Sequence, residues 1–153
     1  MTAPNGERSV RGRSSFAHLA FSLCGASMVA LGLYFVFLRP PLLPEDLRYF
    51  GVTLTELESV APQLLPWLRQ VFTAMGGYIF ATGVLTTFVA RIPPAPLTTT
   101  ALALAGAASV VLMSAVNFAI DSDYKWLMLL PALLWTAGMA ALFLNRPSLT
   151  MRS

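Results

Sequence analysis

The chain of 153 residues has little charge, and it has almost none of the side chains on which most catalytic and metal sites depend. Only 11% of its residues are charged, against roughly 25% in ordinary soluble domains, whereas 56% are hydrophobic. It contains one cysteine, Cys24, and one histidine, His18. An intrachain disulfide is therefore excluded, and a zinc site built from several cysteines and histidines cannot form.

The common catalytic motifs are also absent. The sequence has no C-x-x-C, no H-E-x-x-H, no G-x-S-x-G and no glycine-rich phosphate loop with a lysine. No Asp, Glu, Lys or Arg lies near the middle of any hydrophobic run, which excludes the simplest proton relays and ion-coupled transporters. We therefore expect no catalytic residue, no cofactor and no metal ion, and an enzyme is the less favoured interpretation.

What the sequence does contain is four long hydrophobic runs. Each approaches the roughly 20 residues with which a helix crosses the hydrocarbon of a bilayer. Backbone amides in lipid must be satisfied within the protein, so continuous runs of this length predict helices. The first run leads into FLRPPLLP without a signal-peptidase pattern, so we expect it to be retained. The sequence predicts an all-α membrane protein with four transmembrane helices in an up-down bundle, at about 16–38, 68–90, 98–120 and 126–145.

The distribution of Lys and Arg predicts the orientation. With four crossings, both termini share a side with the 91–97 loop, and that side carries six arginines against four basic residues on the other. Because basic residues favour the cytoplasm, both termini are predicted to be cytoplasmic, and the protein is predicted to be a multi-pass protein of a bacterial inner membrane. We expect residues 1–15 and 146–153 to be disordered tails on either side of a transmembrane domain at 16–145.

A polar segment at 39–67 interrupts the hydrophobic runs, in the first extracytoplasmic loop. Pro44 followed by Glu45 and Asp46 is typical of a helix start, and Gly51 is a natural stop. The segment T-x-x-E at 53–56 has the spacing of a capping box and predicts a second helix start. We expect two short helices, which lie on the outer end of the bundle as a fixed cover or move as a lid.

Small residues recur every four positions on the predicted helices, where they allow close approach of backbones. The predicted packing faces contain Ser22, Ala26 and Ala30 on the first helix, Thr73, Gly77 and Ala81 on the second, and Ala132, Thr136 and Ala140 on the fourth. These faces could contact helices of the same chain, a second copy or another membrane protein.

One polar stripe lies on the third helix. Ser114, Asn117 and Asp121 share a face because their offsets are three and four residues. They predict either interhelical hydrogen bonds or a small polar cavity that opens outward, with Asp121 at its mouth and a counter-charge from one of three arginines, Arg39, Arg48 or Arg69. Glu45, Asp46 and Arg48 are the candidate contact residues of the loop.

Two segments carry a resemblance to known proteins. With R-P-P-L-L-P-E-D-L-R-Y-F-G in the first outer loop and V-F-T-A-M-G-G-Y-I-F-A-T-G in the second helix, the chain resembles small four-helix bacterial inner-membrane proteins of unknown function. The resemblance implies a fold and a location, and it implies no active site.

Three functions remain open. The leading hypothesis is a non-enzymatic accessory or interaction subunit that contacts a membrane-protein partner or a second copy of itself within the lipid bilayer. The second is a binder or carrier of a small lipidic or amphipathic ligand in the outward-facing cavity. The third is a membrane enzyme that uses carboxylates of the outer face. The sequence has no basic patch with interleaved aromatic residues, so a nucleic-acid partner is not expected.

Overall fold

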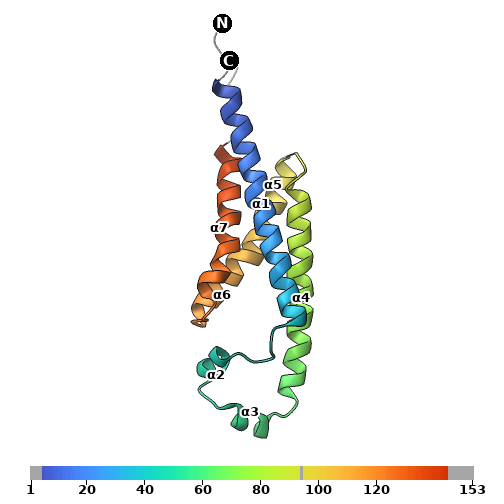
Figure 1. Cartoon of the computed structure of the whole chain (residues 1–153), viewed down its shortest axis with the longest axis vertical. Helices are drawn as coiled ribbons and strands as arrows, with labels where there is room; N and C mark the ends of the chain where they lie inside the picture. The colour runs from blue at the N-terminus through green and yellow to red at the C-terminus, as the bar shows by residue number, and fades with distance from the viewer. Residues whose placement is uncertain (1–4, 94, 145–153) are drawn as a thin grey trace.

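In the computed structural model the described residues, 5–93 and 95–144, are helical apart from short connections, and they include no strand. Side chains are described for 15–93 and 95–144. The elements follow in the order α1 (Asn5–Phe37), α2 (Pro44–Phe50), α3 (Leu54–Val60), α4 (Leu64–Val89), α5 (Pro96–Gly106), the π-helical turn η1 (Ala107–Val111), α6 (Leu112–Ala119) and α7 (Lys125–Leu144) (Figure 1).

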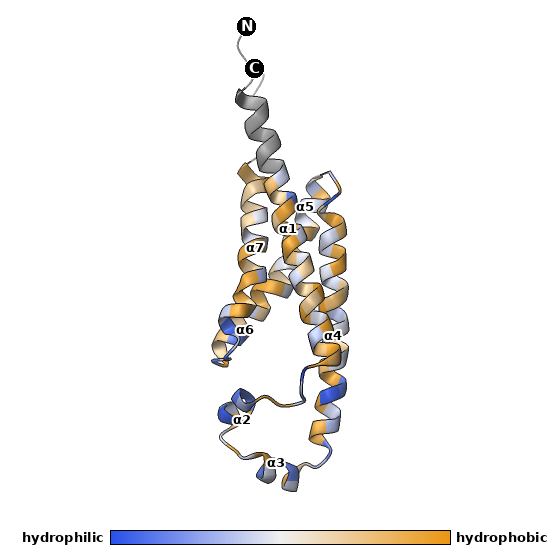
Figure 2. Cartoon of the chain, viewed as in Figure 1, coloured by the Kyte–Doolittle hydropathy of each residue, from blue (hydrophilic) through white to orange (hydrophobic). Residues whose placement is uncertain are grey.

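Four helical segments are long and apolar enough to cross a membrane, which confirms the predicted multi-pass membrane protein. They are Ser15–Phe37, Leu64–Val89, Pro96–Ala119 and Lys125–Leu144. Their lengths of 20 to 26 residues match the hydrocarbon thickness of a bilayer. Figure 2 shows hydrophobic residues along these helices and hydrophilic residues gathered in α2, in α3 and at the helix ends nearest to them.

The first helix begins earlier than the sequence predicted. Residues 5–14 belong to α1, although they were expected to form part of a disordered tail. Once a helix is nucleated by the apolar span, each further residue adds a backbone hydrogen bond without a new nucleation cost, so the helix extends into the polar segment. The predicted tail at 146–153 lies outside the described residues.

Helix α1 lies between α4 and α7 and packs on both (Figure 1). Its contact with α4 depends on two pairs of facing glycines. A Cβ on Gly83 would lie 2.7 Å from the carbonyl oxygen of Gly25, and a Cβ on Gly76 would lie 2.9 Å from that of Gly32. The glycines of each helix are one heptad apart, so the two backbones approach closely along one seam.

This seam is not the face that the small-residue spacing predicted. Ala26, Gly77 and Ala81 are exposed, and a Cβ on Gly77 would meet no atom within 4 Å. On α7 the predicted face is mixed, since Ala132 is buried whereas Ala140 is exposed. A spacing of four residues does not show which face of a helix packs against its neighbour, because these helices carry small residues on more than one face.

The contact between α1 and α7 forms the rest of the core. Cys24 is 1% exposed, and its thiol donates to the carbonyl oxygen of Pro131 at 3.3 Å. Phe21, which is 2% exposed, packs near Met139 in the same region. The contact between α1 and α7 therefore combines a buried hydrogen bond with hydrophobic packing.

The third span is not a continuous α-helix, because η1 separates α5 from α6. At the junction, the indole of Trp135 on α7 covers Gly106, and its Nε1 donates to the carbonyl oxygen of Leu102 at 3.2 Å. A Cβ at Gly106 would overlap this ring, so the close approach requires a glycine. Single π-helical turns are frequent at functional sites, which directs attention to the space beside η1.

The 39–67 segment contains two short helices, α2 and α3. Thr53 is the N-cap of α3, with its hydroxyl accepting from the backbone N–H of Glu56 at 3.2 Å. Helix α2 ends at Gly51, whose φ of 70° favours glycine. Helix α3 makes little contact with the bundle, because each of its residues except Leu57 is exposed, and the choice between a fixed cover and a lid stays open. Helix α3 buries too little apolar surface for that burial to hold the helix against the bundle.

Candidate functional site

A cavity of about 860 Å³ lies between α1, α4, the η1 and α6 segment, and α7. We call it the interhelical cavity. Its volume lies within the roughly 300 to 1,000 Å³ that is typical of small-molecule sites. The π-helical turn borders it through Ala108 and Ser109. The cavity is thus the feature of the fold that can hold a ligand.

Most of the cavity wall is apolar and comes from all four long helical segments. The apolar wall includes Met28 and Leu31 of α1, Met75 and Ile79 of α4, Leu112, Met113 and Val116 of α6, and Leu127, Met128 and Leu130 of α7. Methionine side chains are flexible and adapt to ligands of irregular shape. This wall suits a hydrocarbon or aromatic body.

The charged lining is concentrated where the bundle meets α2, whereas Ser27, Thr82, Ser109 and Asn117 add uncharged polar groups along the wall. Arg39 follows α1, Glu45 and Asp46 belong to α2, and Ser122 lies between α6 and α7. We call these four residues the polar end of the cavity. An apolar wall with a few polar groups at one end is the usual lining of a site for an amphipathic molecule.

Glu45 is the one buried charged residue of this polar end, since Arg39 and Asp46 are partly exposed as whole residues. It is only 6% exposed, and its Oε1 accepts a hydrogen bond of 2.7 Å from the Ser122 hydroxyl. Ser122 is 2% exposed and also accepts from the backbone N–H of Tyr124 at 3.1 Å. This pair fastens α2 to the turn between α6 and α7.

Arg39 is held by several groups at once. Its guanidinium carbon lies 3.5 Å from the centroid of the Phe72 ring, and one guanidinium nitrogen, Nη1, donates to the carbonyl oxygen of Pro40 at 3.0 Å. The other, Nη2, lies 3.5 Å from Asp46 Oδ2. Burial lowers the pKa of Arg39, and the negative charge of Asp46 opposes that effect. The geometry fixes the guanidinium as part of the cavity wall.

Asp46 has two structural roles. Its Oδ2 accepts a hydrogen bond of 2.8 Å from the backbone N–H of Leu43, which caps the start of α2. The same oxygen faces Arg39. Asp46 therefore holds the start of α2 beside the end of α1.

The predicted polar stripe is only partly in the cavity. Asn117 lines it, with its side-chain amide donating to the carbonyl oxygen of Met113 at 2.9 Å. Ser114 is 5% exposed and does not line the cavity, since its hydroxyl donates across to the carbonyl oxygen of Met128 on α7 at 2.8 Å. Ser114 thus makes the interhelical hydrogen bond that was the alternative interpretation of the stripe.

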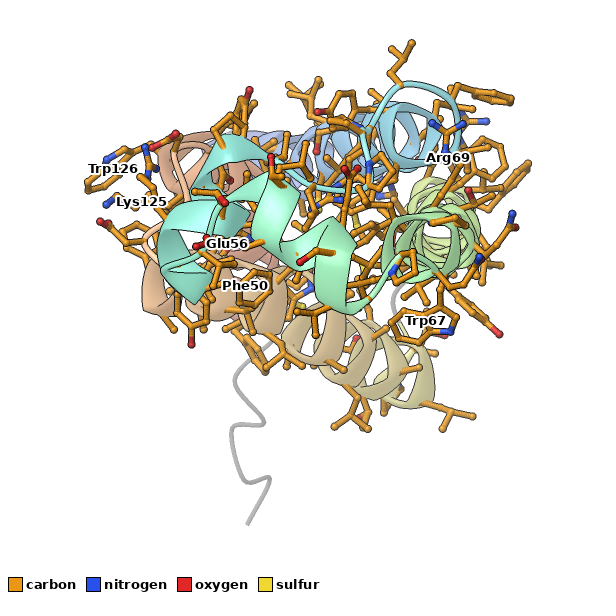
Figure 3. All side chains as sticks on the ribbon, turned by 90° about the horizontal axis from the view of Figure 1, so that it is seen from below. Phe50, Glu56, Trp67, Arg69, Lys125 and Trp126 are labelled. Atoms are coloured by element: carbon orange, nitrogen blue, oxygen red, sulfur yellow. The ribbon has the colours of Figure 1, made fainter. Side chains whose placement is uncertain are left out.

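Asp121 does not lie at the mouth of the cavity. Its side chain is 85% exposed and pairs with Lys125 rather than with one of the three arginines. Its φ of 52° ends the helical register beyond α6, so the spacing by four from Asn117 no longer places it on the same face. The hydrogen bond from Lys125 lowers the pKa of Asp121. Figure 3 shows Lys125 and Trp126 at the edge of the molecule, away from its centre.

Arg48, the third candidate loop residue, also lies outside the cavity. Its Nη2 donates to Asp123 Oδ1 at 2.7 Å in an exposed ion pair, and this hydrogen bond raises the pKa of Arg48. The pair adds a second link between α2 and the turn before α7. Exposed pairs of this kind contribute little stability, so the buried Glu45 and Ser122 pair is the more important link.

The sequence prediction missed Ser122 and the tyrosines at 34 and 124, all of which line the cavity. Ser122 stands between two aspartates in a short connection, where a serine carries no signal beyond that of a turn. The tyrosines are ordinary residues for the ends of membrane helices. No local pattern marked them, because the cavity is formed by segments far apart in the chain.

Comparison of the chain with protein-family models, with curated proteins and with solved structures finds no match. Within the described ranges, no three side chains of the His, Cys, Asp and Glu types are grouped so that they could hold a metal ion.

Proposed function

We propose that this protein is a multi-pass protein of a bacterial inner membrane that binds a small amphipathic molecule in the interhelical cavity. The observation that carries the proposal is the cavity itself, whose volume is about 860 Å³ and whose charged groups, Arg39, Glu45 and Asp46, are gathered at one end. A ligand with an apolar body and a polar head would match both parts of this lining.

The proposed topology is an up-down bundle with both termini in the cytoplasm. The positive-inside rule supports it through the arginines near the termini and in the 91–97 loop. In this orientation α2 and α3 belong to the first extracytoplasmic loop, and the polar end of the cavity lies toward the extracytoplasmic face. The bacterial inner membrane is proposed from the resemblance of the loop and second-helix segments to small four-helix proteins of that membrane.

Filling the cavity tests the proposed binding. Ala108 lines the cavity, whereas Ala105, one turn away on the same span, is exposed and does not line it. The full-length protein would be purified in a mild non-ionic detergent, and its retained or added amphiphiles would be measured by native mass spectrometry. We expect Ala108→Phe to weaken binding by about tenfold or more, equivalent to about 1.4 kcal/mol, and Ala105→Phe to leave it unchanged. Equal binding by both variants and the original protein would reject the proposal.

A second candidate function, an accessory or interaction subunit, is supported by the exposed apolar residues of α3. Val60 is 85% exposed and Leu54 is 42% exposed, and both lie outside the four candidate spans. Exposed apolar residues of this kind suit contact with another protein or with the membrane interface. Val60→Asp should release a co-purifying membrane protein if α3 contacts one, and Glu58→Gln on the same helix is the matched control. Retention of that protein by Val60→Asp would reject the role of α3 in the contact.

A further inference from the structure

The buried carboxylate of Glu45 has fewer partners within the described part of the chain than its chemistry allows. An ionised carboxylate has two oxygens and about four acceptor positions. The Ser122 hydroxyl reaches Oε1, and no side-chain or backbone donor among residues 15–93 and 95–144 reaches Oε2. Because Glu45 is 94% buried and lines the interhelical cavity, a further donor is available only from the cavity.

The nearby cations are already paired with other carboxylates. Arg39 faces Asp46, Arg48 pairs with Asp123, and Lys125 pairs with Asp121. In the portion of the chain whose side chains are described, no cation lies within ion-pair distance of Glu45. The polar end combines one arginine with two carboxylates, so it carries a net negative charge. Arg39 and Arg48 attract Glu45 only from beyond ion-pair distance, so a cation in the cavity would add a direct counter-charge to this buried carboxylate.

Two tyrosines line the same cavity as Glu45. Tyr124 lines the cavity, and its backbone N–H donates to the Ser122 hydroxyl that binds Glu45. Tyr34 lines the cavity from α1. The faces of aromatic rings attract ammonium groups, and this attraction is stronger where water is excluded. Carboxylate and aromatic rings together are a suitable setting for an ammonium group.

We propose that the interhelical cavity selects amphiphiles with a positively charged ammonium head, with Glu45 as the counter-ion and the apolar wall around the hydrocarbon part. This inference rests on the proposed function and names the class of its ligand. A head with only negative charge would meet Glu45 and Asp46 while Arg39 is already engaged by Asp46, Phe72 and two backbone carbonyls. A neutral head would bring no direct counter-charge to Glu45. The ammonium could belong to an aminolipid or to a single-chain amine.

The test compares four probes on the full-length protein in a non-ionic detergent by native mass spectrometry. Phosphatidylethanolamine, phosphatidylglycerol and diacylglycerol with identical acyl chains differ only in the head, and dodecylamine represents a single-chain amine. Two variants accompany the original protein. Glu45→Gln removes the charge but keeps an acceptor for Ser122, and the matched control Glu58→Gln removes an exposed carboxylate on α3 that does not line the cavity.

We expect one of the two ammonium probes to bind about tenfold more tightly than the anionic and neutral lipids. Glu45→Gln should abolish that preference while diacylglycerol still binds, whereas Glu58→Gln should keep it. Preference for phosphatidylethanolamine would identify an aminolipid, and preference for dodecylamine alone would identify a single-chain amine. Equal binding of all probes, or an unchanged preference in Glu45→Gln, would overturn the inference and leave the proposed binding function standing. If no probe binds the original protein more tightly than it binds the Ala108→Phe variant, both the ammonium preference and the proposed binding function are rejected.

Discussion

Glu45 and Ser122 are 77 positions apart in the chain, and a buried hydrogen bond of 2.7 Å joins them. Glu45 belongs to α2, and Ser122 lies in the turn between α6 and α7. The bond therefore links the 39–67 segment to the opposite side of the interhelical cavity. Because both partners are nearly inaccessible to water, the bond is protected from the competition with solvent that weakens exposed pairs.

Removing the Ser122 hydroxyl should loosen α2. Ser122→Ala leaves the buried Glu45 carboxylate without its donor, so we expect a loss of about 1 to 3 kcal/mol in the free energy of unfolding, the usual cost of an unsatisfied buried group. Faster amide hydrogen exchange in 44–50 would show where the loss occurs. Ser59→Ala is the control, because Ser59 is exposed and binds only the backbone oxygen of Glu56. Equal exchange in both variants would contradict the proposed link.

Two adjacent glycines of α4 should respond to alanine with opposite signs. A Cβ on Gly76 would lie 2.8 Å from the Cβ of Phe35, whereas one on Gly77 would meet nothing within 4 Å. We expect Gly76→Ala to destabilise the protein by about 1 to 3 kcal/mol through overpacking. Gly77→Ala should stabilise it by up to about 1 kcal/mol, because alanine is the better helix former. Thermal unfolding in detergent measures the sign of the stability change in each variant. A change of the same sign in both variants would show that α1 and α4 do not meet along the glycine seam.

The four spans were predictable from the sequence because their signal is composition over about twenty residues, and composition does not depend on which helices touch. The packing face was not predictable in the same way. Gly76 and Gly77 are neighbours with identical chemistry, and only the position of Gly32 on α1 determines which of them lies in the contact. Thr53 and Glu56 are a favourable case, because a capping box is formed by residues three apart and needs no tertiary contact.

The candidate site was harder to predict because its residues come from separate segments. The helical register of Asn117 left two alternatives, an interhelical hydrogen bond or a polar cavity, and Asn117 lines the interhelical cavity. The same register placed Asp121 one turn farther along the face, but α6 ends at Ala119 and the chain turns before that position. Glu45 was recognised only as an acidic loop residue, since nothing in its neighbourhood indicates that Ser122, far along the chain, will bury it.

The thiol of Cys24 should report on opening of the contact between α1 and α7. It is 1% exposed, and it donates to the carbonyl oxygen of Pro131. We expect almost no alkylation by a small maleimide in the folded protein and complete alkylation after denaturation, because the reagent reaches the sulfur only when the two helices separate. A cysteine at Val60, which is 85% exposed and outside the four candidate spans, is the control in a Cys24→Ala background and should react readily. Rapid alkylation of Cys24 without unfolding would contradict the described packing.

Acid should weaken the start of α3. The hydrogen bond from the Thr53 backbone N–H lowers the pKa of Glu56 below its ordinary 4.5, and the bond from the Thr53 hydroxyl adds to the effect. A carboxyl whose folded pKa is lowered contributes stability above its unfolded pKa, and this stability is lost as the pH falls through the folded pKa. We expect amide protection at 54–57 to fall on acidification below pH 4.5. Glu56→Gln should remove most of this pH dependence, whereas Glu58→Gln should preserve it.

Arg39 should tolerate lysine poorly even though the charge is kept. Its side chain is only 8% exposed, and its planar guanidinium lies 3.5 Å above the Phe72 ring. A lysine ammonium cannot stack as a plane or reproduce the fork of donors, so Arg39→Lys should lower the stability to thermal unfolding by about 1 to 2 kcal/mol. Arg69→Lys is the control, since Arg69 is exposed on α4 (Figure 3).

A double-mutant cycle separates the stacking from the other contacts of Arg39. If the guanidinium and the ring act together, Phe72→Leu should cost less in the Arg39→Lys background than alone, because the shared interaction has already been lost. The carbonyl oxygens of Pro40 and Pro41 and the carboxylate of Asp46 remain in both backgrounds, so their contributions cancel in the cycle. Strictly additive changes would show that Phe72 only fills space beside Arg39, and the cost of Arg39→Lys would then belong to its contacts with Phe35, Asp46 and the two backbone carbonyls.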